Sequence, residues 1–199
     1  MQKAKKMPVE KLAIGAVLTA LVVILQYMGA FIKFGPFSIS LVLIPIVIGT
    51  ATCGKGIGAW LGFIFGVVVL ANGDAAAFLA VNVPGTVLTV LLKGTACGFI
   101  AGLVYELSLK LFKGNVILAT FAAAIVCPIV NTGIFLLGCV LFFMDTIAQW
   151  ANAFGFGDSV VKYMFFGLAG GNFLFELLAN IVFSPIIVRI MKAIKKESK

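Results

Sequence analysis

Six long apolar runs, with charged residues mostly at their ends, dominate this sequence and constrain its fold more than any other feature. The chain has 199 residues, of which 62% are hydrophobic and 11% are charged. A soluble domain normally carries about 25% charged residues. A helix needs ~20 mainly apolar residues to cross a hydrocarbon core of ~30 Å. The sequence therefore predicts an all-α integral membrane protein in which residues 1–199 form a single transmembrane domain.

We expect a bundle of six transmembrane helices. Their approximate bounds are Leu12–Ala30, Ser38–Thr52, Ile57–Ala71, Gly85–Leu109, Asn115–Phe143 and Phe165–Met191. Pro45 and Pro128 lie inside the second and fifth spans. Each proline frees a backbone carbonyl, which a neighbouring helix or a cavity must satisfy.

The basic residues are distributed unevenly around these spans. With six spans, both termini lie on one side of the membrane, and twelve of the fifteen basic residues fall on that side. Lys33 and Lys162 fall on the opposite side, and Lys93 lies inside a span. Because cytoplasmic segments carry an excess of Lys and Arg, we expect cytoplasmic termini with basic segments at residues 1–11 and 192–199. The net charge of +8 follows from this topology and indicates no nucleic-acid partner.

Lys93 and Glu176 are ionisable residues inside apolar spans. A charge at the centre of a bilayer costs at least ~2.5–3.5 kcal/mol, so such a residue has a partner, lines a wet cavity or binds a ligand. The rise of ~1.5 Å per residue places both in the outer half of the membrane, where Asn131 reaches a similar depth. Asn172, Glu176 and Asn180 share one helix face. Together these residues predict a small-molecule site with a few polar groups in apolar walls.

Asn82 and Trp150, in two of the expected outer loops, complete the candidate substrate-binding residues. Trp150 suits either a lid over the pocket or an anchor at the membrane interface. A structural alternative remains for the set: Lys93 and Glu176 neutralise each other, and the asparagines link helices by hydrogen bonds. Asn180, the deepest of them, fits that structural role best.

Two absences limit the chemistry of the chain. It has no histidine, which removes the commonest general base and His-based metal sites. Because no credible nucleophile–base pair replaces it, we expect no catalytic residue and no metal site, and an embedded enzyme is unlikely on these grounds. The chain also lacks a G-x-x-x-x-G-K-[S/T] phosphate-binding loop, so uphill transport needs an ATPase partner or an ion gradient. A self-sufficient secondary transporter or channel is the main alternative to an ATPase-driven system.

Three stretches resemble the substrate-binding S component of energy-coupling factor (ECF) vitamin transporters. They are FIKFGPFSISLVLIPIVIG, GKGIGAWLGFIFG and NVPGTVLTVLLKGTACGFIAGLVY. The resemblance implies a subunit of the plasma membrane, in a bacterium, that binds a water-soluble vitamin with high affinity from outside. It also implies delivery together with a transmembrane scaffold subunit and two ATPase subunits. The partners would then use ATP, and this chain would bind no cofactor.

The first span carries Ala16 and Ala20, which resemble the A-x-x-x-A patch by which the family docks the scaffold subunit. Small residues make a helix face that another helix can approach closely. Glycines repeat every four residues in and before the third span and in the fourth span, and we expect them to pack inside the bundle. They are Gly54, Gly58, Gly62, Gly66, Gly94, Gly98 and Gly102.

The resemblance does not identify the vitamin. Overall similarity favours pantothenate, and Lys93 is suited to receive the carboxylate of that molecule. Pyridoxine, folate, riboflavin, biotin and other vitamins remain open as substrates.

Overall fold

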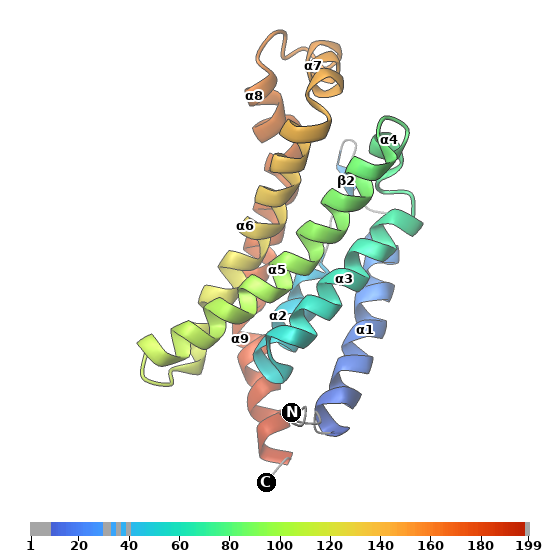
Figure 1. Cartoon of the computed structure of the whole chain (residues 1–199). Coiled ribbons are helices and arrows are strands. Elements are labelled where there is room, and N and C mark those ends of the chain that lie inside the picture. Colours follow the sequence, from blue (N-terminus) through green and yellow to red (C-terminus); the bar gives the residue numbers. More distant parts are fainter. Residues whose placement is uncertain (1–8, 30–32, 35–36, 39–40, 198–199) are drawn as a thin grey trace, which may run out of the picture.

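The computed structural model describes residues 9–29, 33–34, 37–38 and 41–197. Residues 1–8 and 198–199 of the expected basic termini, and Ala30 of the first expected span, lie outside this part of the chain. The described residues form an elongated bundle of helices with one small antiparallel hairpin of strands (Figure 1). In chain order the elements are α1 (Val9–Gly29), β1 (Lys33–Phe34), β2 (Phe37–Ser38), α2 (Leu43–Cys53), α3 (Lys55–Ala71), α4 (Ala76–Leu79), α5 (Val83–Leu111), α6 (Val116–Phe142), α7 (Met144–Ala153), α8 (Val160–Lys162), the π-helix η1 (Tyr163–Gly170) and α9 (Gly171–Glu197).

Four stretches of the described chain are helical, long enough and apolar enough to cross a membrane. They are Val9–Gly29, Val83–Leu111, Val116–Phe142 and Val160–Ile190. The apolar helices α2 and α3 are shorter, with 11 and 17 residues. At ~1.5 Å per residue, α2 is ~16 Å long, about half of a ~30 Å hydrocarbon core.

The bounds of two expected spans differ from those of the helices. In the span expected at Ser38–Thr52, Ser38 belongs to β2 and helix α2 begins at Leu43, while residues 39–40 lie outside the described part of the chain. The span expected from Phe165 starts earlier, with α8 at Val160, and continues through the π-helix η1, which ends at Gly170, into α9, which begins at Gly171. π-Helical turns are frequent at functional sites, and η1 contributes to the pocket described below.

The helix α2 lies in the centre of the bundle. Leu43, Ile46 and Val47 are completely buried, and Pro45 is buried as well. A helix that is apolar on all sides suits such a position. This explains why so short a segment is strongly apolar although it does not match the bilayer thickness.

Helices α3 and α5 lie side by side along their length (Figure 1) and approach at their glycines. A Cβ atom on Gly62 would collide with the carbonyl oxygen of Gly94, and one on Gly98 would collide with that of Gly58. The hydroxyl of Thr50 donates a hydrogen bond of 3.2 Å to the carbonyl of Gly98 at the same contact. The expectation that the repeated glycines pack internally is therefore confirmed for these two helices.

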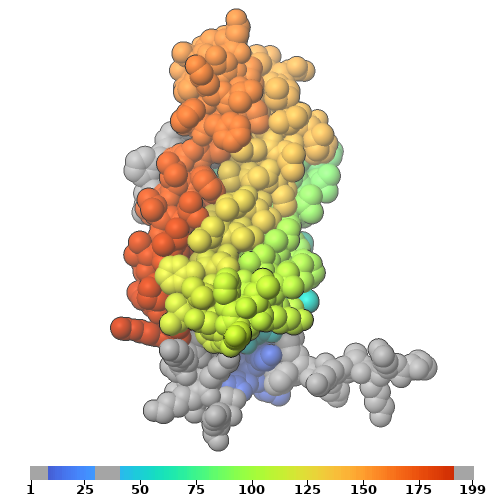
Figure 2. Space-filling view, turned by 90° about the vertical axis from the view of Figure 1, so that its left-hand side faces the viewer, coloured from blue at the N-terminus to red at the C-terminus, as the bar shows by residue number. Residues whose placement is uncertain are grey.

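The outer faces of the long helices carry many exposed apolar side chains. Examples from four helices are Val17, Leu88, Leu141 and Val182. Figure 2 shows one such face, on which α6 and α9 run alongside each other below the segment of α7 and α8. Exposed apolar surface of this extent is unusual for a soluble monomer and suits contact with lipid.

The two ends of the bundle differ. The start of α1, the end of α9 and the α5–α6 connection lie at one end, whereas α4, α7 and α8 lie at the other (Figure 1). The arrangement agrees with an even number of crossings, counted from α1 through α9.

Candidate functional site

An open pocket is formed by α3, α5, α6, η1 and α9, with α1 and the α3–α4 connection at its side. Its atom-free space, including the open mouth, is about 710 Å³, which limits an occupant to a small molecule. Aromatic and aliphatic side chains such as Phe65, Val69 and Phe135 form much of the wall. The polar side chains in the lining are Gln26, Asp74, Lys93, Asn131, Thr132, Asn172 and Glu176.

Glu176 of α9 is at the centre of a hydrogen-bonded group in this wall. Glu176 is only 1% exposed. The amide Nδ2 of Asn172, one helical turn earlier, donates to Oε1 at 3.1 Å. The amide Nδ2 of Asn131 in α6 donates to Oε2 at 3.4 Å. A buried carboxyl group without such partners would carry a large desolvation cost, so the two asparagines stabilise Glu176 in the wall.

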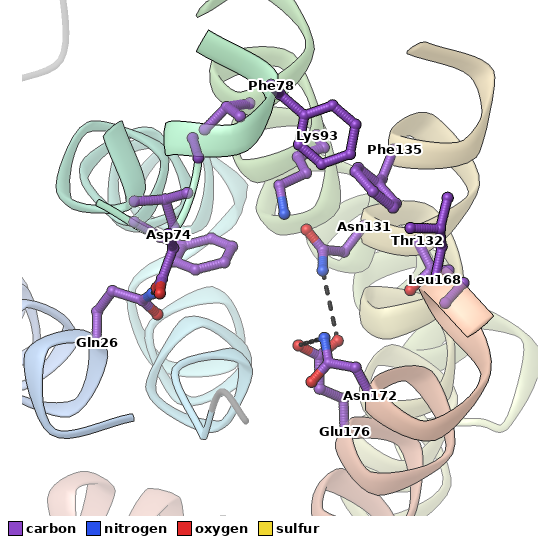
Figure 3. A pocket seen from close by; sticks show the side chains of 15 residues that line it. Gln26, Asp74, Phe78, Lys93, Asn131, Thr132, Phe135, Leu168, Asn172 and Glu176 are labelled. Carbon is purple, nitrogen blue, oxygen red and sulfur yellow. Dashed lines mark hydrogen bonds between the residues drawn. The ribbon is translucent and has the colours of Figure 1, made fainter. Parts of the chain in front are cut away.

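Lys93 of α5 projects into the pocket from a different side (Figure 3). Its ammonium nitrogen lies 5.3 Å from the ring centre of Phe65 and 5.6 Å from that of Phe135. Such positions over aromatic faces attract a cation. Within the described part of the chain, Lys93 forms no direct ion pair and no hydrogen bond, so its charge and that of Glu176 interact only across the pocket. Among the described residues, an ion pair of 2.9 Å joins Lys55 and Glu106. Glu106 also belongs to α5 but lies far from Lys93 along that helix.

Gln26 and Asp74 line the pocket but were not among the residues expected from the sequence. The Nε2 of Gln26, which is buried in α1, donates to Oδ2 of Asp74 at 2.7 Å. The same oxygen accepts from Nδ2 of Asn72 at 2.9 Å. Gln26 is a polar residue in an otherwise apolar span, which is the signal that singled out Glu176. Asp74 sits in a short connection and carries no such signal.

These features are matched by one comparison with known proteins. The family model for the substrate-specific component of ECF transporters matches residues 10–191. The chain belongs to this family. No match was found among curated proteins. The protein is therefore a substrate-binding S component of an ECF transporter, a multi-pass membrane protein and not an enzyme.

The structure brings four of the expected site residues of this S component into one pocket: Lys93, Asn131, Asn172 and Glu176. They come from α5, α6 and α9. Along the chain, the other three residues follow Lys93 by 38 to 83 positions. Membership of the family implies that the occupant is a small-molecule substrate.

The other three expected residues lie outside the lining of the S component's pocket. Asn82 caps the amino end of α5, where its side-chain oxygen accepts from the backbone N–H of Gly85 at 2.9 Å. Asn180, buried one turn beyond Glu176, donates to the backbone carbonyl of Glu176 at 2.8 Å. Trp150 of α7 packs edge-on against Phe78, with ring centres 5.3 Å apart, and so lies behind a wall residue. Asn82 and Asn180 thus form hydrogen bonds to nearby backbone groups, which asparagine side chains commonly do.

Ala16 and Ala20 are exposed on α1 of the S component. Their spacing of four residues places them on one face of the helix. This face is open for a neighbouring helix, and a docking role for it stays a prediction. Among the described residues no group of three or more His, Cys, Asp and Glu side chains is positioned to hold a metal ion.

Proposed function

We propose that this S component captures a water-soluble vitamin outside the plasma membrane of a bacterium and passes it inward with an ATP-driven module. The module would consist of a transmembrane scaffold subunit and two ATPase subunits. ATP is used by those partners, and this chain binds no cofactor. The observation that carries the binding role is Lys93: an ammonium group that faces the pocket and forms no direct ion pair among the described residues.

Pantothenate is the first candidate among the vitamins. Its carboxylate would give Lys93 the charge-assisted hydrogen bond that the protein itself does not supply. Its hydroxyl groups are donors that suit the oxygens around Glu176. The pocket walls of Phe65, Val69 and Phe135 suit its apolar middle. Pyridoxine, folate, riboflavin and biotin are the other candidates to be tested beside it.

We propose six membrane crossings with both termini in the cytoplasm. The short helices α2 and α3 would make the second and third crossings, with α2 shielded from lipid by its neighbours. The distribution of the basic residues supports this orientation. The pocket lies toward the extracellular end, because Asp74 and Phe78 in its lining belong to the connection around α4.

The ligand is best identified directly. The full-length chain is purified in mild detergent, denatured, and the released small molecules are analysed by mass spectrometry. Titration calorimetry of ligand-free protein with each vitamin then ranks the candidates. We expect one vitamin to be released and to bind more tightly than the others, with pantothenate first. Absence of binding to every vitamin tested would refute the vitamin-binding role.

Dependence on partners is tested by reconstitution. Vesicles containing the chain alone are compared with vesicles that also contain the scaffold and the two ATPases with ATP inside. We expect uptake of the identified ligand only in the second case. Uptake by the chain alone would instead indicate a self-sufficient transporter or channel.

A further inference from the structure

We propose that the pocket binds its substrate in one orientation: an acid group toward Lys93, and hydroxyl or N–H donors toward the side-chain oxygens of Asn131 and Asn172. The substrate class is then a carboxylic acid that also carries hydroxyl or N–H donors. This inference rests on the proposed function of the same pocket and adds the chemistry and direction of the ligand.

The first argument is the direction of the two amide groups beside Glu176. Both asparagines direct Nδ2 toward the carboxylate, which accepts from them at 3.1 Å and 3.4 Å. The reverse orientation would place an amide oxygen against a carboxylate oxygen, and two acceptors without a proton between them repel. Glu176 thus determines where the two Oδ1 atoms lie. Glu176 takes one N–H from each of Asn131 and Asn172 and leaves both Oδ1 acceptors for another molecule.

The second argument is that these two acceptors have no partner. Oδ1 of Asn131 and Oδ1 of Asn172 are buried and accept no hydrogen bond. Asn131 is only 3% exposed, and both residues line the pocket. Figure 3 shows the Asn131 oxygen on the side of the amide that faces away from Glu176 and toward Lys93. A buried acceptor without a donor costs ~1–3 kcal/mol, which a ligand hydroxyl or N–H would recover.

The third argument is the position of the charged donor in the pocket. The amide nitrogens of Gln26, Asn131 and Asn172 each direct one N–H at a carboxylate. The hydroxyl of Thr132 is able both to donate and to accept. Lys93 is the cationic donor in the lining that has no acceptor within the described chain. One region of the pocket therefore offers a positive donor, whereas the region around Glu176 offers acceptors.

A ligand must complement both regions at once. An acid without donors would leave the oxygens of Asn131 and Asn172 unpaired, and a polyol without an acid would leave Lys93 without an anionic acceptor. Lys93 comes from α5 and the oxygens come from α6 and α9, so the two regions lie on different walls (Figure 3). The substrate must therefore present its acid group and its donors to different walls.

Three probes separate the two requirements. Pantothenate has the acid and the hydroxyl groups. Pantothenol replaces the acid by an alcohol. The β-alanine amide of tert-butylacetic acid keeps the acid and the amide but lacks both hydroxyl groups. Affinities are measured by calorimetry on the full-length chain. We expect each of the two altered probes to bind at least ~tenfold more weakly than pantothenate, because each loses hydrogen bonds to a charged or buried group.

Two variants assign each loss to its wall. In Lys93→Met, pantothenate and pantothenol should bind equally, while the preference for hydroxyl groups persists. In Asn172→Leu, the preference for hydroxyl groups should fall at least severalfold, while the preference for the acid persists. Asn172→Ser is the substitute if the leucine variant does not fold. The opposite assignment, or equal effects of both variants on both preferences, would overturn the orientation.

The outcome is distinguishable from failure of the proposed function. If pantothenate does not bind, the molecule released from the purified protein decides. A vitamin that lacks either an acid group or a hydroxyl or N–H donor would overturn this inference and leave the vitamin-binding role intact. A released acid with such donors that is not a vitamin would support the inference and refute the vitamin-binding role. Failure of every vitamin, with no released molecule, would refute both.

Discussion

Gln26 in α1 donates a hydrogen bond of 2.7 Å to Asp74 in the α3–α4 connection, although the two residues are 48 positions apart. Asn72 donates to the same carboxylate oxygen at 2.9 Å. Gln26 and Asp74 both line the pocket, so this bond connects α1 to the side of the substrate site. The helix that carries the exposed Ala16 and Ala20 is thereby tied to the pocket itself.

Replacing Gln26 by leucine tests this connection. Leucine fits a buried position, but it leaves Asp74 with one donor, Asn72. A hydrogen bond to a charged group contributes ~1.5–3 kcal/mol, and we expect a loss of stability near the lower limit because Asp74 is only half-buried. The melting temperature in detergent should fall. The exposed neighbouring position provides the control Tyr27→Phe, for which no change is expected; equal melting temperatures of the two variants would show that the bond contributes little.

The separation of Lys93 from Glu176 predicts how their substitutions combine. Lys93→Met should lower the affinity for an acidic ligand by ~tenfold to a hundredfold, without lowering the melting temperature. Because the two residues form no ion pair, adding Glu176→Gln should not restore stability. Lys162→Met removes an exposed charge from the same end of the molecule and should leave affinity unchanged. A destabilised Lys93→Met that recovers in the double variant would instead show a structural pair.

The glycine contact between α3 and α5 predicts opposite effects for two alanine substitutions. Gly62→Ala places a methyl group on the backbone of Gly94, and an overpacked site typically costs ~1–3 kcal/mol. Gly133→Ala lies within α6 with no atom near the added methyl group, and should be neutral or stabilising by up to ~1 kcal/mol. Thermal unfolding of both variants checks this. A stable Gly62→Ala protein would mean that the helices can separate at little cost.

The exposed small residues of α1 predict a variant that separates binding from transport. Ala16→Trp combined with Ala20→Trp should abolish uptake by the complete transporter and leave ligand affinity of the isolated chain nearly unchanged. The matched control is Leu178→Trp with Val182→Trp, at exposed positions with the same spacing on α9. It should retain uptake. Equal loss of affinity and uptake in the alanine variant would mean that this face packs against the protein itself.

The proposed topology is tested by labelling single cysteines at positions 113 and 162. The two positions lie at opposite ends of the bundle, in the α5–α6 connection and in α8 (Figure 1). The four native cysteines are buried, which keeps the background low. A membrane-impermeant reagent added to intact cells should label position 162 and not position 113. Labelling of both from the same side would contradict an even number of spans with cytoplasmic termini.

Some site residues were predictable because the bilayer makes polar residues conspicuous. Lys93 and Glu176 interrupt apolar runs, and with Asn131 they line the same pocket. Asn82, expected from its place in an outer loop, caps α5 and lies outside the pocket lining, since an asparagine in a connection serves a helix cap as readily as a ligand. Asp74 was missed, because a carboxylate in a polar connection has no burial cost to explain and so does not stand out in the sequence.

The sequence alone determined the helical class, the apolar surface and the polar residues within the spans, because each of these follows from local composition and from the period of one helix. Its glycine repeats also indicated where helices approach closely. Tertiary structure decided which polar groups meet. The bond from Gln26 to Asp74, the amides directed at Glu176 and the placement of Lys93 over Phe65 and Phe135 each join separate elements. Those contacts depend on the relative rotation and position of packed helices, and no single helix encodes them.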